Sequence, residues 1–192
     1  MKEHISQKLQ EAVESKKRLL GMEGHIFQMS SLIVDSFRKG GKVVLFGNGG
    51  SAADAQHIAA EFVCLLDKSK ERPSMHATAL TTNPSIVTAV SNDFGYEHLF
   101  SRQVEGIVNE NDVVIGISTS GNSLNIINGL MAAKRKGAKT IGFSGESQSR
   151  MDDIGLDFVF RAPSTDCNRI QEMHITVGHI LCGAVEKEMH SL

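Results

Sequence analysis

Three ionisable side chains share one stripe of a mostly apolar segment at residues 51–66. Asp54, His57 and Glu61 are spaced i, i+3 and i+7, which puts them on one face of a helix. His57 and Glu61 are four residues apart and can converge on one metal ion or one substrate atom. The segment holds no lysine or arginine, so the stripe does not resemble a solvated face of mixed charge. An exposed His–Glu pair of little energetic worth is the alternative, but the nearby glycine-rich turn favours a functional role.

A second histidine, His179, lies among apolar residues in the C-terminal segment. It is either a hydrogen-bonded core residue or a proton-transfer group, and its pattern alone favours the core histidine. Gln171 precedes it by eight residues, about 12 Å along a helix axis. The spacing alone therefore predicts no metal site, although the chemistry of the side chains permits one.

Two turns have the composition of anion-binding sites. Residues 47–51 (Gly-Asn-Gly-Gly-Ser, the glycine turn) allow close backbone approach, and Ser51 is a good N-cap. Residues 118–123 (Ser-Thr-Ser-Gly-Asn-Ser, the hydroxyl turn) offer four hydroxyls and free N–H groups at a helix N-terminus, which favours phosphate. Neither turn contains a P-loop ending or the glycine spacing of a dinucleotide fingerprint. They favour a sugar phosphate over a nucleoside triphosphate, and ordinary strand-to-helix connections are the alternative.

The elements that must position these residues alternate along the chain. Apolar runs predict strands, and helical periodicity predicts the helices that separate them. The predicted strands are 42–47, 77–80, 112–117, 139–143 and 156–160, and the predicted helices are 4–20, 26–37, 51–66, 84–91, 123–136 and 168–189. Such strands predict a parallel sheet covered on both faces, in one α/β domain. The first two helices precede the first strand and are not part of this minimal core. They either form a subunit interface or pack against the sheet of their own chain.

The composition excludes several classes of function. A net charge of -2 and a pI near 6.4 give no electrostatic footprint for nucleic acid or a membrane surface. The absence of tryptophan and a single tyrosine leave few platforms for stacking bases. Cys64, Cys167 and Cys182 have no C-x-x-C spacing, so they predict neither a disulfide framework nor a thiolate zinc site. Without a signal or membrane-spanning pattern, we expect a soluble cytoplasmic protein.

Four stretches together resemble the phosphoheptose isomerases, the sedoheptulose 7-phosphate isomerases of the sugar isomerase (SIS) domain group. These stretches are residues 47–57, 91–95, 117–123 and 169–174. The resemblance extends over essentially the whole chain. It implies a flavodoxin-like, three-layer SIS domain spanning residues 1–192, with a five-stranded parallel sheet flanked by helices. It also implies a homotetramer with active sites at subunit interfaces, packed through the helical extension at residues 1–40.

The resemblance assigns roles by position. Phosphate would be held by Ser118, Thr119, Ser120 and Ser123. The other implied substrate-binding residues are Asn48, Gly49, Gly50, Ser51, Glu61, Asn92, Asp93 and Gln171. One zinc ion per subunit would be bound by His57, Glu61, Gln171 and His179. Glu61 and His179 would be the catalytic pair.

The implied reaction converts sedoheptulose 7-phosphate to D-glycero-D-manno-heptose 7-phosphate through an enediol, for ADP- or GDP-heptose synthesis and bacterial lipopolysaccharide or capsule. Glu61 suits a base beside the C–H bond, and His179 suits an acid near the carbonyl oxygen. Zinc would polarise the carbonyl or fix the geometry. Leu65 stands where many members have arginine, and Asn168 where some have aspartate or a small residue. Both departures bear on the identity of the sugar phosphate more than on the reaction.

A second class of protein shares the implied fold. Replication-initiator-associating proteins resemble this chain over residues 169–174, but they act as non-catalytic tetrameric scaffolds. They typically lack the residues present here as Glu61 and His179, so the enzyme is favoured. A sugar-phosphate sensor without turnover and an isomerase of a related sugar phosphate are further alternatives.

Overall fold

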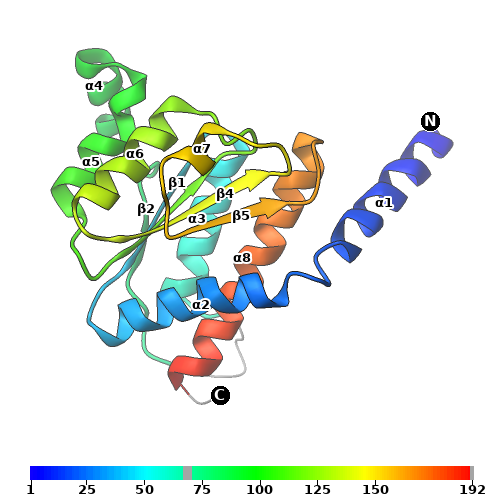
Figure 1. Cartoon of the computed structure of the whole chain (residues 1–192), viewed down its shortest axis with the longest axis horizontal. Coiled ribbons are helices and arrows are strands. Elements are labelled where there is room, and N and C mark those ends of the chain that lie inside the picture. The colour runs from blue at the N-terminus through cyan, green and yellow to red at the C-terminus, as the bar shows by residue number, and fades with distance from the viewer. Residues whose placement is uncertain (67–70, 191–192) are drawn as a thin grey trace.

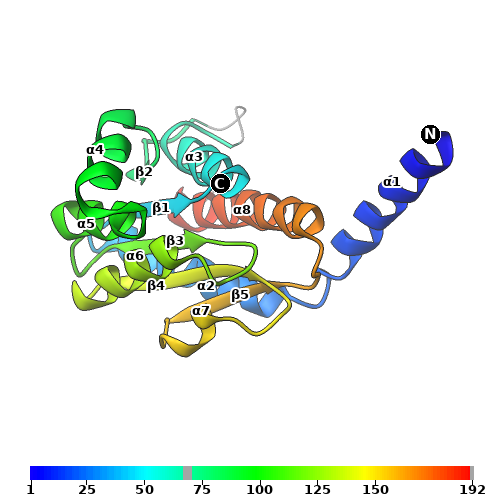
Figure 2. The ribbon, with the colours of Figure 1, turned by 90° about the horizontal axis from the view of Figure 1, so that it is seen from above.

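The computed structural model describes residues 1–66 and 71–190, and its centre is a parallel β-sheet. The strands are β1 (Val43–Gly47), β2 (Ala77–Ala79), β3 (Val113–Ile117), β4 (Lys139–Gly145) and β5 (Phe158–Ala162). Their order is β2-β1-β3-β4-β5, and each neighbouring pair is parallel, as predicted (Figures 1 and 2). β5 begins two residues later than expected because Asp157 turns toward β4, where its carboxylate accepts the Thr140 N–H at 2.9 Å.

Helices cover both faces of the sheet, which confirms the three-layer α/β fold (Figure 2). One face packs against α2 (Glu23–Arg38), α3 (Gly50–Val63) and α8 (Cys167–His190). The other packs against α5 (Leu99–Ile107), α6 (Leu124–Arg135) and α7 (Arg150–Asp153). Each face of the sheet has its own hydrophobic core, and alternate residues of β1 pack into them. Val43 and Leu45 belong to one core, and Val44 and Phe46 belong to the other. This alternation explains why the strands are apolar along their whole length.

Several helices differ from the sequence prediction, and neither α7 nor the short 3₁₀ helix η1 (Tyr96–His98) was expected. α5 was not expected at all; it buries Leu99, Phe100 and Val104 on one short face. α4 (Pro84–Phe94) continues past residue 91 and ends before Gly95, whose φ of 91° suits glycine. α3 ends at Val63 instead of residue 66. The side chain of Arg72 donates hydrogen bonds to backbone carbonyl oxygens of the last turn of α3.

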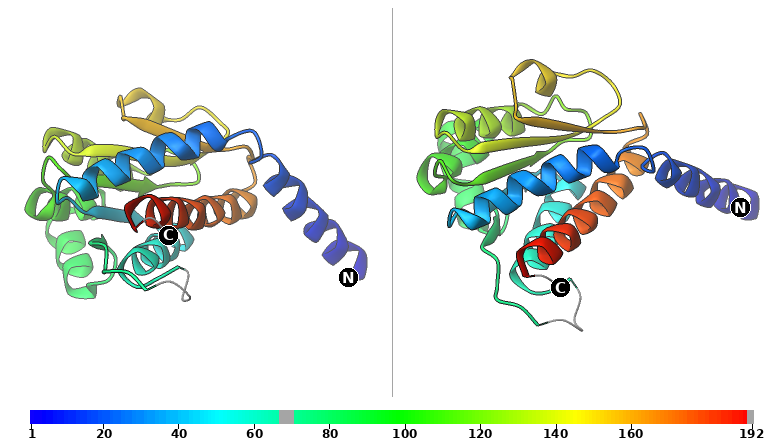
Figure 3. Two further views of the ribbon diagram at one scale, coloured as in Figure 1. Left: turned by 90° about the horizontal axis from the view of Figure 1, so that it is seen from below. Right: turned by 60° about the horizontal axis from the view of Figure 1, so that its bottom comes forward.

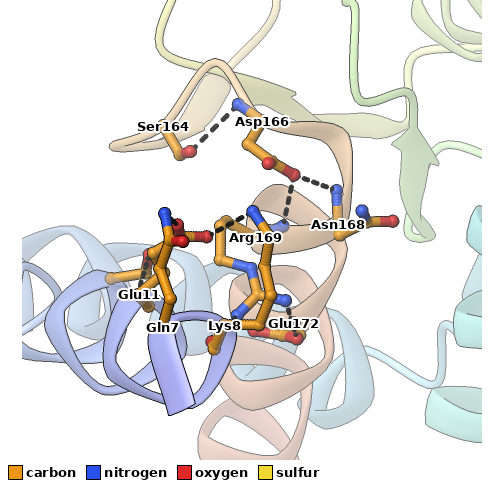
Figure 4. Close-up of polar contacts among 9 residues, drawn as sticks. Gln7, Lys8, Glu11, Ser164, Asp166, Asn168, Arg169 and Glu172 are labelled. Carbon is orange, nitrogen blue, oxygen red and sulfur yellow. Dashed lines mark hydrogen bonds and ion pairs between the residues drawn. The ribbon is translucent and has the colours of Figure 1, made fainter. Parts of the chain in front are cut away.

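The first helix, α1 (Lys2–Lys17), projects away from the sheet and buries none of its residues (Figures 1 and 3). It ends before the predicted residue 20, and Leu19 enters the core where the chain turns toward α2. One guanidinium N–H of Arg169 donates to the Lys8 carbonyl oxygen at 3.1 Å and joins α1 to the start of α8 (Figure 4). Within the described part of the chain, none of the helices combines the length and hydropathy that crossing a bilayer demands.

Candidate functional site

The glycine turn and the hydroxyl turn lie side by side at one edge of the sheet. They follow β1 and β3, which are paired along their length so that Gly47 is opposite Ile117. The strand order reverses between these two strands, and ligands of open parallel sheets bind at such a reversal, beyond the carboxyl ends of the strands.

The hydroxyl turn gathers its side chains at the N-terminus of α6. Ser118 Oγ lies 3.0 Å from Ser123 Oγ and 3.4 Å from Ser120 Oγ. Gly121 has a φ of 63°, and a Cβ there would lie 2.6 Å from the Cβ of Ser149, so the turn requires glycine. Ser123 is the N-cap of α6 but makes no side-chain cap bond. Its hydroxyl therefore remains available to an anion at the positive end of the helix.

The start of α3 differs from the prediction at Ser51. The N-cap is Gly49, with a φ of 55°, and Ser51 is buried in the first helical turn. A Cβ at Gly50 would lie 2.6 Å from Nε2 of Gln171, so the glycine lets the Gln171 amide lie against this turn. The structure thus brings Gln171, from α8, to the glycine turn.

Asn48 of the glycine turn is held by two residues that sequence reasoning missed. Asn48 and Asn125 exchange amide hydrogen bonds of 2.9 and 2.8 Å, and the Tyr96 hydroxyl donates to Asn48 Oδ1 at 2.9 Å. Asn125 is buried at the start of α6, and a polar residue among the apolar residues of that helix was the available signal. Asn92 and Asp93 are exposed on α4, where the Asn92 amide donates to Asp93 Oδ1 at 2.7 Å. Across residues 1–66 and 71–190, neither side chain makes a hydrogen bond to the two turns.

His57, Glu61 and His179 form one cluster between α3 and α8. Nε2 of His57 lies 3.1 Å from Glu61 Oε1 and 3.2 Å from Nε2 of His179. The rings of the two histidines meet edge to face, with centroids 4.8 Å apart. Ligand atoms of all three residues lie within 4.8 Å of one another. The side chain of Glu61 is about one-fifth exposed (21%), so solvent screens it only in part.

The donor set of the cluster suits a divalent metal. Two imidazole nitrogens and a carboxylate oxygen are zinc ligands with bonds of about 2.0–2.2 Å, and a tetrahedral ion holds such ligands roughly 3.3–3.6 Å apart. The separations of His57 Nε2 from Glu61 Oε1 and from His179 Nε2 are already close to that range. The three residues are therefore able to hold a metal ion after small rotations of their side chains.

Close packing of α3 and α8 brings His179 to His57. A Cβ at Gly178 would lie 2.5 Å from Cδ1 and 2.6 Å from Cγ1 of Ile58, so only glycine allows this approach. Gly178 and Ile58 are the immediate neighbours of His179 and His57 in sequence. This contact between the helices therefore sets the distance between the two imidazoles.

The core histidine of α8 is His174, not His179. His174 is fully buried, and burial lowers its pKa to about 4, so the ring is neutral at physiological pH. Its Nε2 lies 3.0 Å from the carbonyl oxygen of Ser144, to which the neutral ring donates. His179 is only partly buried and faces His57. The preference for a core role at His179, based on its apolar neighbours, was wrong because the sheet covers another face of the helix.

Asp54 completes the stripe predicted on α3. Burial raises the pKa of its carboxyl to about 6, against the attraction of His57. Oδ2 of Asp54 is buried without a hydrogen-bond partner among the described residues. The helix thus carries a second carboxyl, one turn before His57, in a poorly solvated environment.

A family model, sequence relatives and solved structures all relate this chain to the sugar isomerase domain proteins. The model of the SIS domain family matches residues 6–145. The chain is 43% identical to a phosphoheptose isomerase of Akkermansia muciniphila over 190 residues, which cover 99% of both chains. A solved phosphoheptose isomerase structure from Neisseria gonorrhoeae matches with a TM-score of 0.90 and 33% identity, covering 97% of this chain and 98% of that one. Another, from Francisella tularensis, matches with a TM-score of 0.92 and 30% identity, covering 96% and 97%.

Proposed function

Because this chain belongs to the phosphoheptose isomerases of the SIS domain family, we propose that it converts sedoheptulose 7-phosphate to D-glycero-D-manno-heptose 7-phosphate. The observation that carries the proposal is the cluster of His57, Glu61 and His179, a carboxylate and two imidazoles whose ligand atoms lie within 4.8 Å of one another. Aldose–ketose isomerisation needs such a base and acid on adjacent atoms of the substrate.

The substrate is anchored by its phosphate in the hydroxyl turn. Ser118, Ser120 and Ser123 already converge at the N-terminus of α6, and Thr119 completes the set of hydroxyls. The sugar hydroxyls then meet the glycine turn, where Asn48 is oriented by Asn125 and Tyr96. Asn92 and Asp93 remain candidates for contacting the sugar, from the exposed face of α4.

Glu61 and His179 move the protons. Glu61 removes a proton from C1 of the ketose while His179 donates one to the oxygen on C2, which gives the enediol. Glu61 then returns its proton to C2 while the hydroxyl on C1 gives its proton back to the imidazole, which leaves the aldose and the starting form of the enzyme. The incomplete solvation of Glu61 favours this exchange because bulk water would otherwise compete for the proton.

Zinc is the proposed cofactor, one ion per subunit. His57, Glu61 and His179 would hold it, with Gln171 as the fourth ligand from the same helix as His179. The ion would supply a Lewis acid that polarises the substrate carbonyl. The support for this assignment is the donor set and the spacing of its ligand atoms.

A homotetramer packed through residues 1–40 is the proposed assembly. α1 buries none of its residues and exposes Ile5, Leu9 and Val13. Next to it, a groove of about 870 Å³ runs between α2 and α8, and exposed Phe27 and Ile180 line it. Apolar surface of this kind marks an interaction site in a soluble protein, and a second copy of the chain supplies a matching apolar surface. Active sites near these helices would then lie at subunit interfaces.

The setting we propose is cytoplasmic synthesis of ADP- or GDP-heptose for a bacterial lipopolysaccharide or capsule. All three cysteines are free thiols, which agrees with a reducing compartment. The two departures from the family pattern lie near the site: Leu65 follows the end of α3, and Asn168 lies in the first turn of α8. In that turn the Cys167 thiol contacts the Thr119 hydroxyl at 3.5 Å. An isomerase of a related sugar phosphate is therefore the second candidate.

Turnover of purified protein tests the proposal. Incubation with sedoheptulose 7-phosphate should yield an aldoheptose phosphate, followed by NMR of the anomeric protons or by a coupled assay. A related ketose phosphate turned over faster would support the second candidate. Binding of sugar phosphates without any turnover, in protein loaded with zinc, would contradict the enzyme and favour the scaffold or sensor.

A further inference from the structure

A buried ion pair joins the segment after α3 to the C-terminal half of α8. Nε of Arg72 lies 2.5 Å from Oε1 of Glu186, and the two side chains are only 1% and 5% exposed. Neither residue has a role in the chemistry proposed above. Charged side chains this deeply buried need a compensating arrangement, because taking both ions out of water is costly.

Arg72 also binds the last turn of the helix that carries Glu61. One terminal nitrogen, Nη2, donates to the carbonyl oxygen of Glu61 itself at 2.9 Å. The other, Nη1, donates to the carbonyl oxygens of Phe62 at 2.9 Å and Pro73 at 3.0 Å. The final carbonyls of a helix lack partners within the helix, and a cation at this end also interacts favourably with the helix dipole. Arg72 therefore caps α3 at the position of the proposed base.

Glu186 lies on the same face of α8 as His179. The two residues are seven positions apart, which is about two helical turns. His179 contacts His57 of α3, and Glu186 holds the arginine that binds the end of α3. α8 thus contacts α3 directly at the cluster and, two turns further on, through Arg72.

We propose that Arg72 and Glu186 are positioning residues that fix Glu61 relative to His179 for the proton transfer. The inference rests on the proposed isomerase function. The ion pair holds the backbone of Glu61 at one distance from α8, while the contact of Gly178 with Ile58 sets the distance at the preceding turns. Rates of proton transfer depend steeply on such geometry, and a displacement of about 1 Å is able to lower a rate by roughly 10²-fold.

Stability and positioning can be separated in this pair. Removing one partner leaves an uncompensated buried charge, whereas replacing both by apolar residues of similar size is often neutral for folding. The double replacement does not restore the donors to the carbonyls of Glu61 and Phe62. A purely structural pair would therefore recover fully in the double variant, and a positioning pair would not.

The experiment compares Arg72→Met, Glu186→Met and the double variant with wild type, measuring Tm, kcat and KM. We expect each single variant to lower Tm by roughly 10 °C. We expect the double variant to regain most of that loss while its kcat stays roughly 10- to 100-fold low, with KM within about threefold of wild type. Lys42→Met is the matched control, because it breaks another largely buried ion pair, with Asp112, at the opposite ends of β1 and β3. It should lower Tm and leave kcat unchanged.

Recovery of both Tm and kcat in the double variant would overturn the positioning role. A crystal structure of the double variant supplies a readout that does not depend on turnover: the separation of the Cα atoms of Glu61 and His179 should change by more than about 0.5 Å. An unchanged separation would also overturn the inference. A wild-type protein that fails to isomerise sugar phosphates would contradict the proposed function instead, and the crystallographic comparison would still test the ion pair.

Discussion

Replacing Gly178 by alanine tests whether the approach of α3 to α8 controls the chemistry. The new Cβ would lie 2.5 Å from Cδ1 of Ile58, whereas carbon atoms in contact are about 3.5–4.0 Å apart. Relief of this overlap requires a separation of about 1 Å between the helices or a strained rotamer of Ile58. His179 and His57 adjoin the two contacting residues, so the separation acts directly on the cluster.

The expected effect on stability is small because two contributions oppose each other. Overpacking costs about 1–3 kcal/mol, and the better helix propensity of alanine returns about 1 kcal/mol. Gly178→Ala should therefore lower the free energy of unfolding by about 0–2 kcal/mol. The expected effect on turnover is far larger, a loss in kcat of about 10²-fold, because the proposed acid, His179, moves by about 1 Å relative to the proposed base, Glu61.

A second substitution separates this effect from general damage. Ile58→Ala alone should cost about 2–5 kcal/mol because Ile58 is fully buried. Combined with Gly178→Ala it makes room for the new methyl group, so the two free-energy changes should be non-additive by at least about 1 kcal/mol. The double variant should also recover most of the lost kcat. Gly106→Ala is the control, since the same methyl group in α5 would meet no atom within 4 Å.

Urea unfolding and turnover of sedoheptulose 7-phosphate are the two measurements. If Gly178→Ala kept the wild-type kcat, the contact with Ile58 would have no bearing on the chemistry. If Ile58→Ala failed to restore kcat in the double variant, the overlap of these two side chains would not be the cause of the loss. Either result would refute the reasoning from helix packing.

Three further predictions address the proposed base, the proposed phosphate site and the dependence of stability on pH. Glu61→Gln should lower kcat by about 10²-fold or more while substrate still binds, because the amide cannot accept the proton; a near-normal kcat would rule out this base. Ser120→Ala should raise KM and weaken binding followed by the fluorescence of Tyr96, the only tyrosine in a chain without tryptophan; unchanged binding would count against the hydroxyl turn. His174 has a folded pKa below its unfolded value, so it binds a proton more readily in the unfolded state, and stability falls as pH drops from 6.5 toward 4. His174→Gln keeps an N–H for Ser144 but loses the titrating ring. Between pH 7 and pH 5 its free energy of unfolding, measured with urea, should fall by about 2 kcal/mol less than that of wild type; an identical pH dependence would refute this.

Local patterns predicted most of the fold and several parts of the site. The strands are apolar on both faces because helices cover both sides of the sheet, and that property is visible in a short window of sequence. The two turns after β1 and β3 were recognisable from glycines and hydroxyls alone. The pair of His57 and Glu61 followed from a spacing of four residues on one helix.

Contacts between distant segments were beyond this reasoning. His57 meets His179 across 122 positions because α3 crosses α8 at Gly178, and helical periodicity does not reveal where two helices cross. For the same reason the core histidine was sought at His179 and found at His174. The hydrogen bond from Tyr96 to Asn48 spans 48 positions, and Tyr96 begins a short 3₁₀ helix (Tyr96–His98) that the sequence pattern did not reveal.

If the chain assembles as proposed, the projecting helix α1 makes the activity of the enzyme depend on protein concentration. An isolated helix of this length is only marginally stable in water, and α1 buries no side chain in its own subunit. In the proposed homotetramer its order would depend on neighbouring copies, so dilution into the nanomolar range should melt α1 as that assembly dissociates. Specific activity measured over a dilution series would then report whether residues 2–17 remain helical.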